Sequence, residues 1–305
     1  MLVGQLTAVE LRRRLAGEGL GIRTGPVAFR IRCDLQTVER GIARLYADYP
    51  VLGDEDFCDH VLEVRRVGGL RRWLRPQVRV HHDAAPIFEP LPLGHALPLL
   101  EWAMNWCVSA HAHGYVVVHA AAIERDGAAA ILPAPPGSGK STLCAALIHR
   151  GWRLLSDELA LLSLADGRVH ALARPVSLKN QSIEVIGRFA PGTIFAEPTR
   201  DTAKGTVTQM KVQTVHVRRV DESARPAWIV FPRWLAGAPA ALRPRGKPET
   251  LLALSRNIFN FGITGREGYE RLLAAVDASA CFDFEYGRLD DAVRVFDALA
   301  RGEAP

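Results

Sequence analysis

The sequence predicts an α/β domain over residues 99–305 that follows a smaller α+β domain over residues 1–98. The larger domain is indicated by the order strand, glycine-rich loop, helix, strand between residues 128 and 156, which is typical of α/β sheets. The smaller domain is indicated by short alternating segments interspersed with helical spacing. A proline-rich connection over 86–98 then separates the two domains.

The smaller domain begins with a predicted amphipathic helix in residues 1–19, for which Thr7 is a candidate cap. Residues 27–32 alternate like a strand, residues 35–46 return to helical spacing, and two further alternating segments follow at 57–64 and 77–81. We interpret the last two as a hairpin that turns at Gly68-Gly69.

A basic stripe crosses this hairpin. We interpret it as a solvated face and not as a nucleic-acid surface, because stacking aromatic residues are too few. Its residues are Arg65, Arg66, Arg71, Arg72, Trp73, Arg75 and Arg79.

The larger domain opens with a tryptophan-rich helix over 97–112. Short apolar runs predict buried strands at 115–118 and 128–132, and good helix formers predict a helix at 142–150 that Gly151 closes. Strands are expected next at 152–156 and 159–164. The remaining predicted elements are strands at 228–231 and 282–286 and helices at 183–189, 248–260, 267–278 and 289–301.

The loop 134–141 has the composition of a phosphate-binding P-loop. Gly137 and Gly139 allow backbone N–H groups to face a phosphate, and the helix that follows directs the positive end of its dipole to the same place. Lys140 supplies a cation for the β- and γ-phosphates, and Ser141 offers a hydroxyl to Mg²⁺. The candidate nucleotide-binding residues are Pro136, Gly137, Ser138, Gly139, Lys140, Ser141 and Thr142.

The loop departs from the pattern G-x-x-x-x-G-K-[ST] at its first position, where Ala134 replaces glycine. Alanine disfavours a positive φ. We therefore expect the chain to enter the loop through an ordinary backbone conformation.

An acid pair, Asp157-Glu158, follows the strand predicted at 152–156. The short separation from Lys140 predicts that this strand is the sheet neighbour of the P-loop strand. Adjacent carboxylates suit phosphoryl transfer, since one can accept a substrate proton while the other helps to hold Mg²⁺. The alternative is that Asp157 caps a helix, but the apolar run 159–164 before Asp166-Gly167 favours a second strand and a turn.

His119 is predicted to end the strand before the loop. Alone, such a histidine is most often a core residue whose hydrogen bonds are satisfied. Together with Asp157, it is a candidate to orient the base or to share its proton.

His119, the loop 134–141 and Asp157-Glu158 occur in the order and spacing of the catalytic domain of the bacterial HPr serine kinase/phosphorylase. The chain also resembles a subgroup called HPr-kinase-related kinase A. The kinase-type resemblance covers about residues 114–300, and the subgroup resemblance covers nearly the whole chain. The subgroup resemblance is carried by residues 100–106, 151–158, 174–180 and 201–206.

The resemblance implies a P-loop kinase domain of the HPr kinase C-terminal type, which is PEP-carboxykinase-like, with ATP and Mg²⁺ as cofactors. It implies an active site of His119, Lys140, Ser141 and Asp157, with Asp157 as the general base for a serine. Glu158 stands where the family usually has a second aspartate and is assigned with Ser141 to the metal. HPr kinase forms hexamers, so the resemblance is compatible with a homo-oligomer.

We expect Mg-dependent transfer of a phosphoryl group from ATP to a serine hydroxyl of a protein or peptide. The stretch that supports phosphorolysis in HPr kinase is not recognisable, which favours kinase chemistry. One alternative is a kinase of a small molecule, such as a free amino acid. Another is an ATP-binding regulator that signals through the N-terminal domain. A switch GTPase is disfavoured because the sequence lacks an Asn-Lys-x-Asp motif.

Composition agrees with a globular protein, since 48% of the 305 residues are hydrophobic and 23% are charged. The net charge of +5 fits an anionic nucleotide or an acidic partner and does not indicate nucleic acid. Five scattered cysteines without a C-x-x-C pair indicate reduced thiols. No apolar run reaches membrane-spanning length, and charges from Glu10 onward disfavour a signal peptide, so we expect a cytoplasmic protein that does not bind membranes.

Overall fold

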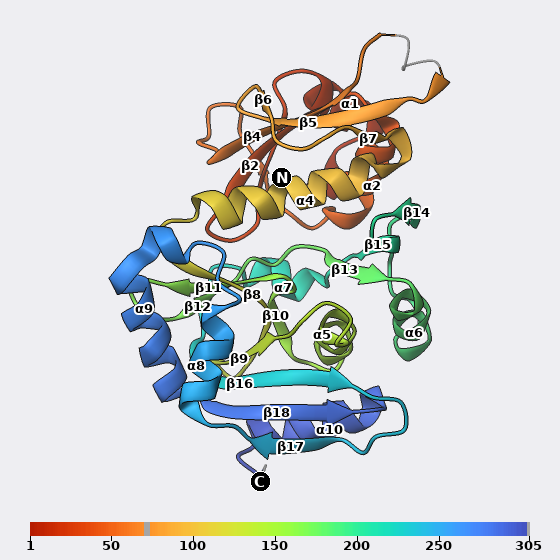
Figure 1. Ribbon diagram of the computed structural model, residues 1–305. Coiled ribbons are helices and arrows are strands. Elements are labelled where there is room, and N and C mark those ends of the chain that lie inside the picture. The colour runs from red at the N-terminus through yellow and green to blue at the C-terminus, as the bar shows by residue number, and fades with distance from the viewer. Residues whose placement is uncertain (70–73, 304–305) are drawn as a thin grey trace. The chain divides into compact units, whose positions relative to one another are not determined.

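The computed structural model describes residues 1–69 and 74–303 of the 305-residue chain. The chain forms two compact units (Figure 1). The first contains residues 1–108, 174–183 and 193–217, and the second contains residues 109–173, 184–192 and 218–305. The predicted ranges 1–98 and 99–305 divide the chain once, whereas in the structure two later segments return to the first unit.

The first unit contains a mixed sheet in the order β3-β1-β2-β4-β5-β6, with β7 paired to β5. The β2–β4 pair is parallel and the other pairs are antiparallel. The strands are β1 (Leu20–Arg23), β2 (Ala28–Cys33), β3 (Val51–Leu52), β4 (His60–Arg66), β5 (Gln77–His82), β6 (Ala85–Pro86) and β7 (Leu91–Pro92). The helices are α1 (Ala8–Ala16), α2 (Gln36–Leu45) and most of α4 (Ala96–His111), with 3-10 turns at Val3–Gln5 and Leu93–His95.

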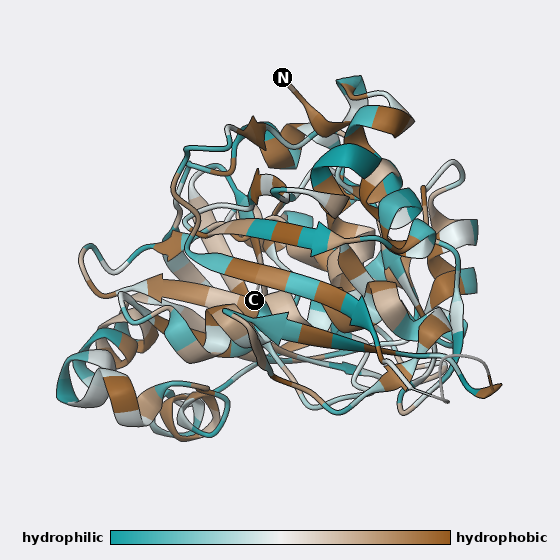
Figure 2. Cartoon of the chain, turned by 90° about the horizontal axis from the view of Figure 1, so that it is seen from above, coloured by the Kyte–Doolittle hydropathy of each residue, from teal (hydrophilic) through white to brown (hydrophobic). Residues whose placement is uncertain are grey.

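Local sequence signals account for these elements. The predicted cap is confirmed, since the Thr7 hydroxyl accepts the Glu10 N–H at 3.2 Å and the Glu10 carboxylate accepts the Thr7 N–H at 2.8 Å. In β4, burial alternates with position, and Figure 2 shows similar alternation as brown and teal bands along strands. Strands β4 and β5 pair antiparallel, as the predicted hairpin requires. The turn is not at Gly68-Gly69, because the Val67 N–H already donates to the Gln77 carbonyl at 2.9 Å and nine residues connect the two. Arg71, Arg72 and Trp73 of the basic stripe lie outside the described residues.

A small antiparallel sheet completes the first unit. Its order is β13-β15-β14. Residues 201–206, one of the stretches that carry the subgroup resemblance, lie where two of its strands join, with positive φ at Asp201 and Gly205. The elements are β13 (Val176–Lys179), β14 (Thr199–Thr202) and β15 (Gly205–Met210), with α6 (Gln181–Phe189) and α7 (Thr214–Arg218) beside them in the sequence.

The second unit is built on a sheet in the order β12-β11-β8-β9-β16-β18-β17, with β10 also paired to β8. The pairs of β16 with β9 and with β18 are parallel, and the other pairs are antiparallel. The chain is therefore a mixed α/β protein. The strands are β8 (Tyr115–Arg125), β9 (Ala128–Pro133), β10 (Arg153–Ser156), β11 (Leu159–Ser163), β12 (Val169–His170), β16 (Arg225–Trp234), β17 (Ala241–Pro244) and β18 (Ala280–Tyr286).

Helices cover both faces of this sheet (Figure 1). One face packs against α8 (Lys247–Ser255) and α9 (Phe261–Ala278) through a buried cluster that includes Val118 and Ala120 of β8 and Leu272 of α9. Helices α5 (Lys140–Ile148) and α10 (Leu289–Ala300) contact each other on the opposite face.

Within the described residues, no helix combines the length and the hydrophobicity needed to cross a membrane. All five cysteines are free thiols, and four of them are buried.

Candidate functional site

The predicted phosphate-binding loop lies between β9 and α5 in the second unit. Gly137 and Gly139 have φ values of 86° and 90°, and Gly139 is the N-cap of α5. This left-handed conformation is one that glycine adopts without strain. Ala134 does not have a positive φ, so the ordinary conformation expected there is confirmed.

Two strand ends that are distant in sequence hold the loop. The Ser138 carbonyl accepts the Trp234 N–H at 2.9 Å, and the Gly139 carbonyl accepts the Tyr286 hydroxyl at 3.1 Å. A Cβ at Gly139 would lie 2.5 Å from the Tyr286 hydroxyl oxygen and 3.0 Å from the Trp234 Cβ. Sequence reasoning missed both aromatic residues, because no local pattern connects them to the loop.

The loop has features that fit an anionic group such as a phosphate. A Cβ at Gly137 would meet open space, so the backbone is accessible there. The hydroxyl oxygen of Ser138 is buried and makes no hydrogen bond within the described structure. The first turn of α5 adds N–H groups that have no partner inside the helix and the positive end of the helix dipole. These are the groups that bind phosphates at helix N-termini.

The structure corrects the predicted position of the acid pair in the sheet. Strand β10 is not the neighbour of β9, because it pairs with β8. Since β8 is antiparallel to both β9 and β10, β10 runs parallel to β9 with one strand between them. Asp157-Glu158 therefore emerge at the same edge of the sheet as the loop, about two strand spacings (~10 Å) away. The second strand predicted after the pair is confirmed as β11, so Asp157 does not cap a helix.

The position of His119 is also corrected. The residue lies inside β8 and does not end it, because β8 continues through small apolar residues to Arg125. The backbone N–H of His119 donates to the Asn257 carbonyl at 2.7 Å, and the centroid of its imidazole ring is 5.5 Å from that of the Phe259 ring.

Strand β8 connects the three sequence features. Ala120 pairs with Pro133, the last residue of β9, and His119 pairs with Leu159, the first residue of β11. Ser156 pairs with Ala122, so the acid pair lies beside Ala120 and Ala121. One short stretch of β8 thus separates the start of the loop from the acid pair, and His119 adjoins it.

The charges of Lys140 and Asp157 both act on the thiol of Cys144 in α5. Burial raises the pKa of the Cys144 thiol well above its ordinary value, the charge of Asp157 raises this pKa further, and the charge of Lys140 opposes the rise. Both charged side chains are themselves buried, with exposures of 8% for Lys140 and 6% for Asp157. Of the other predicted site residues, Ser138, Gly139, Ser141, Thr142 and Glu158 are half-buried, and Pro136 and Gly137 are exposed.

Two other stretches that carried the sequence resemblance meet in the first unit. Arg174 donates to the Glu101 carboxylate at 2.5 Å and to the Asn105 side chain at 2.7 Å, and the Tyr46 hydroxyl donates to Glu101 at 2.7 Å. Both Arg174 and Glu101 are buried. Residues 100–106 and 174–180 therefore form part of the core of that unit.

Comparisons with known proteins give weak likenesses to solved structures only. No family model and no curated protein matches the chain. A solved structure that matches is the HPr(Ser) kinase/phosphatase from Coxiella burnetii, with 12% sequence identity and a TM-score of 0.27 over 61% of this chain and 94% of that one. That protein is of the kind that the motifs resemble, but a superposition this poor supports no assignment for the present chain.

Proposed function

We propose that the chain is an ATP-dependent kinase that transfers a phosphoryl group to a serine hydroxyl of a protein or peptide. The observation that carries this proposal is the register of β8, which brings the start of the loop, His119 and Asp157-Glu158 to one short stretch of that strand. The proposal is supported by the P-loop sequence and by the left-handed glycines that open the loop backbone.

In this proposal the loop binds the phosphates of ATP. Backbone N–H groups around Gly137 and Gly139 face the phosphate oxygens, and Lys140 balances the negative charge that they carry. Ser141 and Glu158 are the residues that would hold Mg²⁺, because their side chains offer the oxygen ligands that this ion prefers. Bound Mg²⁺ would supply charge neutralisation at the phosphates.

Asp157 acts as the general base. Its carboxylate accepts the proton of the serine hydroxyl while the serine oxygen forms a bond to the γ-phosphorus and the bond from that phosphorus to the β–γ bridging oxygen breaks. ADP leaves with the electrons of the broken bond. His119 is a positioning residue for Asp157, because the β8 register brings it next to the acid pair.

The test measures transfer from γ-labelled ATP, with Mg²⁺, into host-cell lysate that is then separated into protein and small-molecule fractions. Wild type should label a protein band. Asp157→Asn should retain ATP binding and lose transfer by a factor of about 10² to 10⁴, whereas Lys140→Ala should weaken ATP binding. Asp126→Asn is the matched control, since Asp126 is exposed in the β8–β9 turn at φ 52°, which asparagine tolerates.

Each other outcome identifies a different activity. Label confined to the small-molecule fraction would indicate a metabolite kinase. ATP binding without transfer in either fraction would indicate an ATP-binding regulator. Undiminished transfer by Asp157→Asn would contradict the role of Asp157 as the base.

A further inference from the structure

A second cluster of chemically reactive side chains lies in the first unit. His60 begins β4, His82 ends β5, and Cys107 lies near the end of α4. One potential ligand atom from each of the three lies within 4.8 Å of the other two. None of these residues belongs to the unit that holds the phosphate-binding loop.

The sheet register places the two histidines on one face. His82 pairs with Leu62 of β4, and His60 lies two residues before Leu62, so that the three side chains point to the same side. This is the buried side of β4. Helix α4 packs there, since the ring of Trp106 meets that of His82 edge-on at 5.6 Å and the adjacent Cys107 is fully buried.

The geometry of the donor atoms suits a tetrahedral metal ion. His60 Nδ1 and His82 Nε2 are 3.0 Å apart. Two nitrogens on one tetrahedral Zn²⁺ lie about 3.3 Å apart, because each Zn–N bond is about 2.0–2.1 Å long. A carboxylate oxygen of Asp83 lies 3.2 Å from the same His82 nitrogen, but Asp83 is not one of the residues whose ligand atoms all lie within 4.8 Å of one another.

Neighbouring rings restrain the orientation of the imidazoles. The His60 ring lies 5.7 Å from Phe29 and 5.1 Å from His82, measured between centroids. Both His60 and Cys107 are buried, with His60 only 7% exposed. Side chains held in this way lose little conformational freedom when they bind an ion.

We propose that His60, His82 and Cys107 bind a zinc ion as three of its four ligands. Imidazole nitrogens and a thiolate suit Zn²⁺, whereas Mg²⁺ and Ca²⁺ prefer oxygen ligands. The Cys107 thiolate, together with the Asp83 carboxylate beside His82, offsets the charge of the ion, which favours its burial. The bound ion fastens α4 to the hairpin of β4 and β5.

The test uses the full-length protein with Zn²⁺ or Co²⁺ as the probe. After incubation with Zn²⁺ and removal of unbound metal by gel filtration, mass spectrometry of the metal content should find about one Zn²⁺ per wild-type chain. With Co²⁺, wild type should show the visible bands of a tetrahedral site and a near-ultraviolet charge-transfer band from the thiolate.

Variants show which residues bind the metal and give the charge-transfer band. Cys107→Ala should lose the charge-transfer band and most of the bound Zn²⁺, and His82→Ala should also lose the Zn²⁺. The matched controls are Cys33→Ala, which removes another buried thiol of the same unit, and His81→Ala, which removes the neighbour of His82 on the opposite face of β5. Both controls should bind metal as wild type does.

Thermal unfolding gives an independent readout. Added Zn²⁺ should raise the melting temperature of wild type and of both controls but not that of Cys107→Ala. The proposal is overturned if folded wild type retains no Zn²⁺, or if the Co²⁺ charge-transfer band is absent from wild type or persists in Cys107→Ala. Because the wild-type spectrum alone reports the thiolate ligand, the test remains decisive if a variant fails to fold.

Discussion

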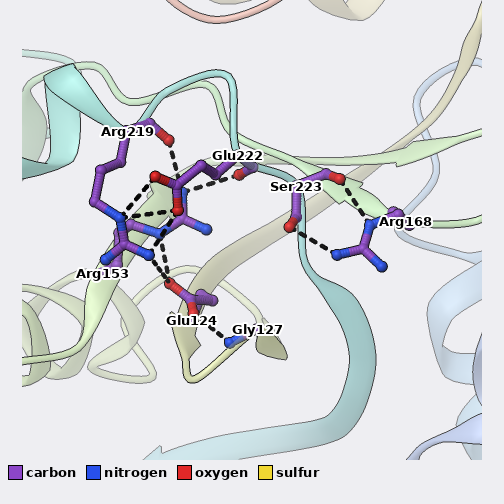
Figure 3. Close-up of polar contacts among 7 residues, drawn as sticks. All are labelled: Glu124, Gly127, Arg153, Arg168, Arg219, Glu222 and Ser223. Atoms are coloured by element: carbon purple, nitrogen blue, oxygen red, sulfur yellow. Dashed lines mark hydrogen bonds and ion pairs between the residues drawn. The ribbon is translucent and has the colours of Figure 1, made fainter.

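Arg153 and Glu124 form an ion pair whose side chains are only 4% and 2% exposed (Figure 3). The Arg153 guanidinium also donates to the carbonyls of Arg219 and Glu222 at 2.9 and 3.0 Å. The Glu124 carboxylate also accepts the Gly127 N–H at 2.6 Å in the turn between β8 and β9. This pair therefore ties β8, and the turn that leads from it into β9, to β10 and to residues 219–222.

We expect Arg153→Met to lower the free energy of unfolding by about 3–5 kcal/mol, because the buried Glu124 carboxylate then keeps only the more distant Arg219, at 3.8 Å, as a counterion. Urea unfolding measures this change. The double variant Arg153→Met/Glu124→Gln should recover part of the loss, since the buried charge is then removed. Arg168→Met is the control, because the half-buried Arg168 side chain donates to the hydroxyl and carbonyl of the uncharged Ser223. A loss no larger than that of the control would contradict the expectation.

Substitutions at the two loop glycines distinguish the effect of backbone strain on ATP binding from the effect of steric overlap. Gly139→Ala combines a positive φ with a Cβ that lies 2.5 Å from the Tyr286 hydroxyl oxygen, whereas Gly137→Ala adds a Cβ in open space and introduces strain alone. We expect Gly137→Ala to weaken ATP binding roughly tenfold, from about 1–2 kcal/mol of strain, and Gly139→Ala to weaken it further.

Isothermal titration with ATP measures both effects. In the double variant Gly139→Ala/Tyr286→Phe, removal of the hydroxyl should restore binding toward that of Gly137→Ala. Equal binding by Gly137→Ala and Gly139→Ala would show that the contact with Tyr286 does not constrain the loop.

His149, at the end of α5, should give stability a pH dependence. Burial and, to a lesser degree, the charge of Arg150 lower the pKa of His149 below its usual value. The unfolded chain then takes up a proton at about pH 6.5 while the folded chain stays neutral, so the stability is complete above that pH and falls as the pH drops toward the folded pKa. Urea unfolding of wild type and of His149→Gln between pH 7.5 and 5.5 should show the steeper loss in wild type. Parallel curves would contradict this expectation.

The buried network of Arg174 should stabilise the first unit. Arg174→Met leaves the Glu101 carboxylate buried without its counterion, so we expect a loss of about 3–5 kcal/mol. Tyr46→Phe removes one hydrogen bond to that carboxylate and should cost about 1.5–3 kcal/mol. In Arg174→Met, hydrogen exchange resolved by peptide should be faster than in wild type in α2, β13 and the first three turns of α4. Uniform acceleration across both units would contradict a role confined to the first unit.

The sequence predicted those features that depend on residues close together in the chain. The loop 134–141, the cap at Thr7 and the strand after Asp157-Glu158 each follow from local patterns, and the structure contains all three. The pairing of β10 with β8 was not predictable, because short apolar strands carry no signal for which neighbour they join.

Contacts over long sequence distances account for the rest. Tyr286 reaches the Gly139 carbonyl across 147 positions, and His60, His82 and Cys107 come from two strands and a helix. Neither grouping leaves a spacing that a single sequence reveals. The return of residues 174–183 and 193–217 to the first unit was missed for the same reason.

That return has a consequence for how the protein is made. Glu101 is synthesised long before Arg174, its ion-pair partner 73 positions later, and the small sheet of the first unit ends only at Met210. A growing chain on the ribosome therefore cannot finish its N-terminal half first and the remainder afterwards. A fragment that stops at residue 108 would keep Glu101 without Arg174, so a truncated N-terminal piece should be a poor substitute for the whole chain in expression and in crystallisation.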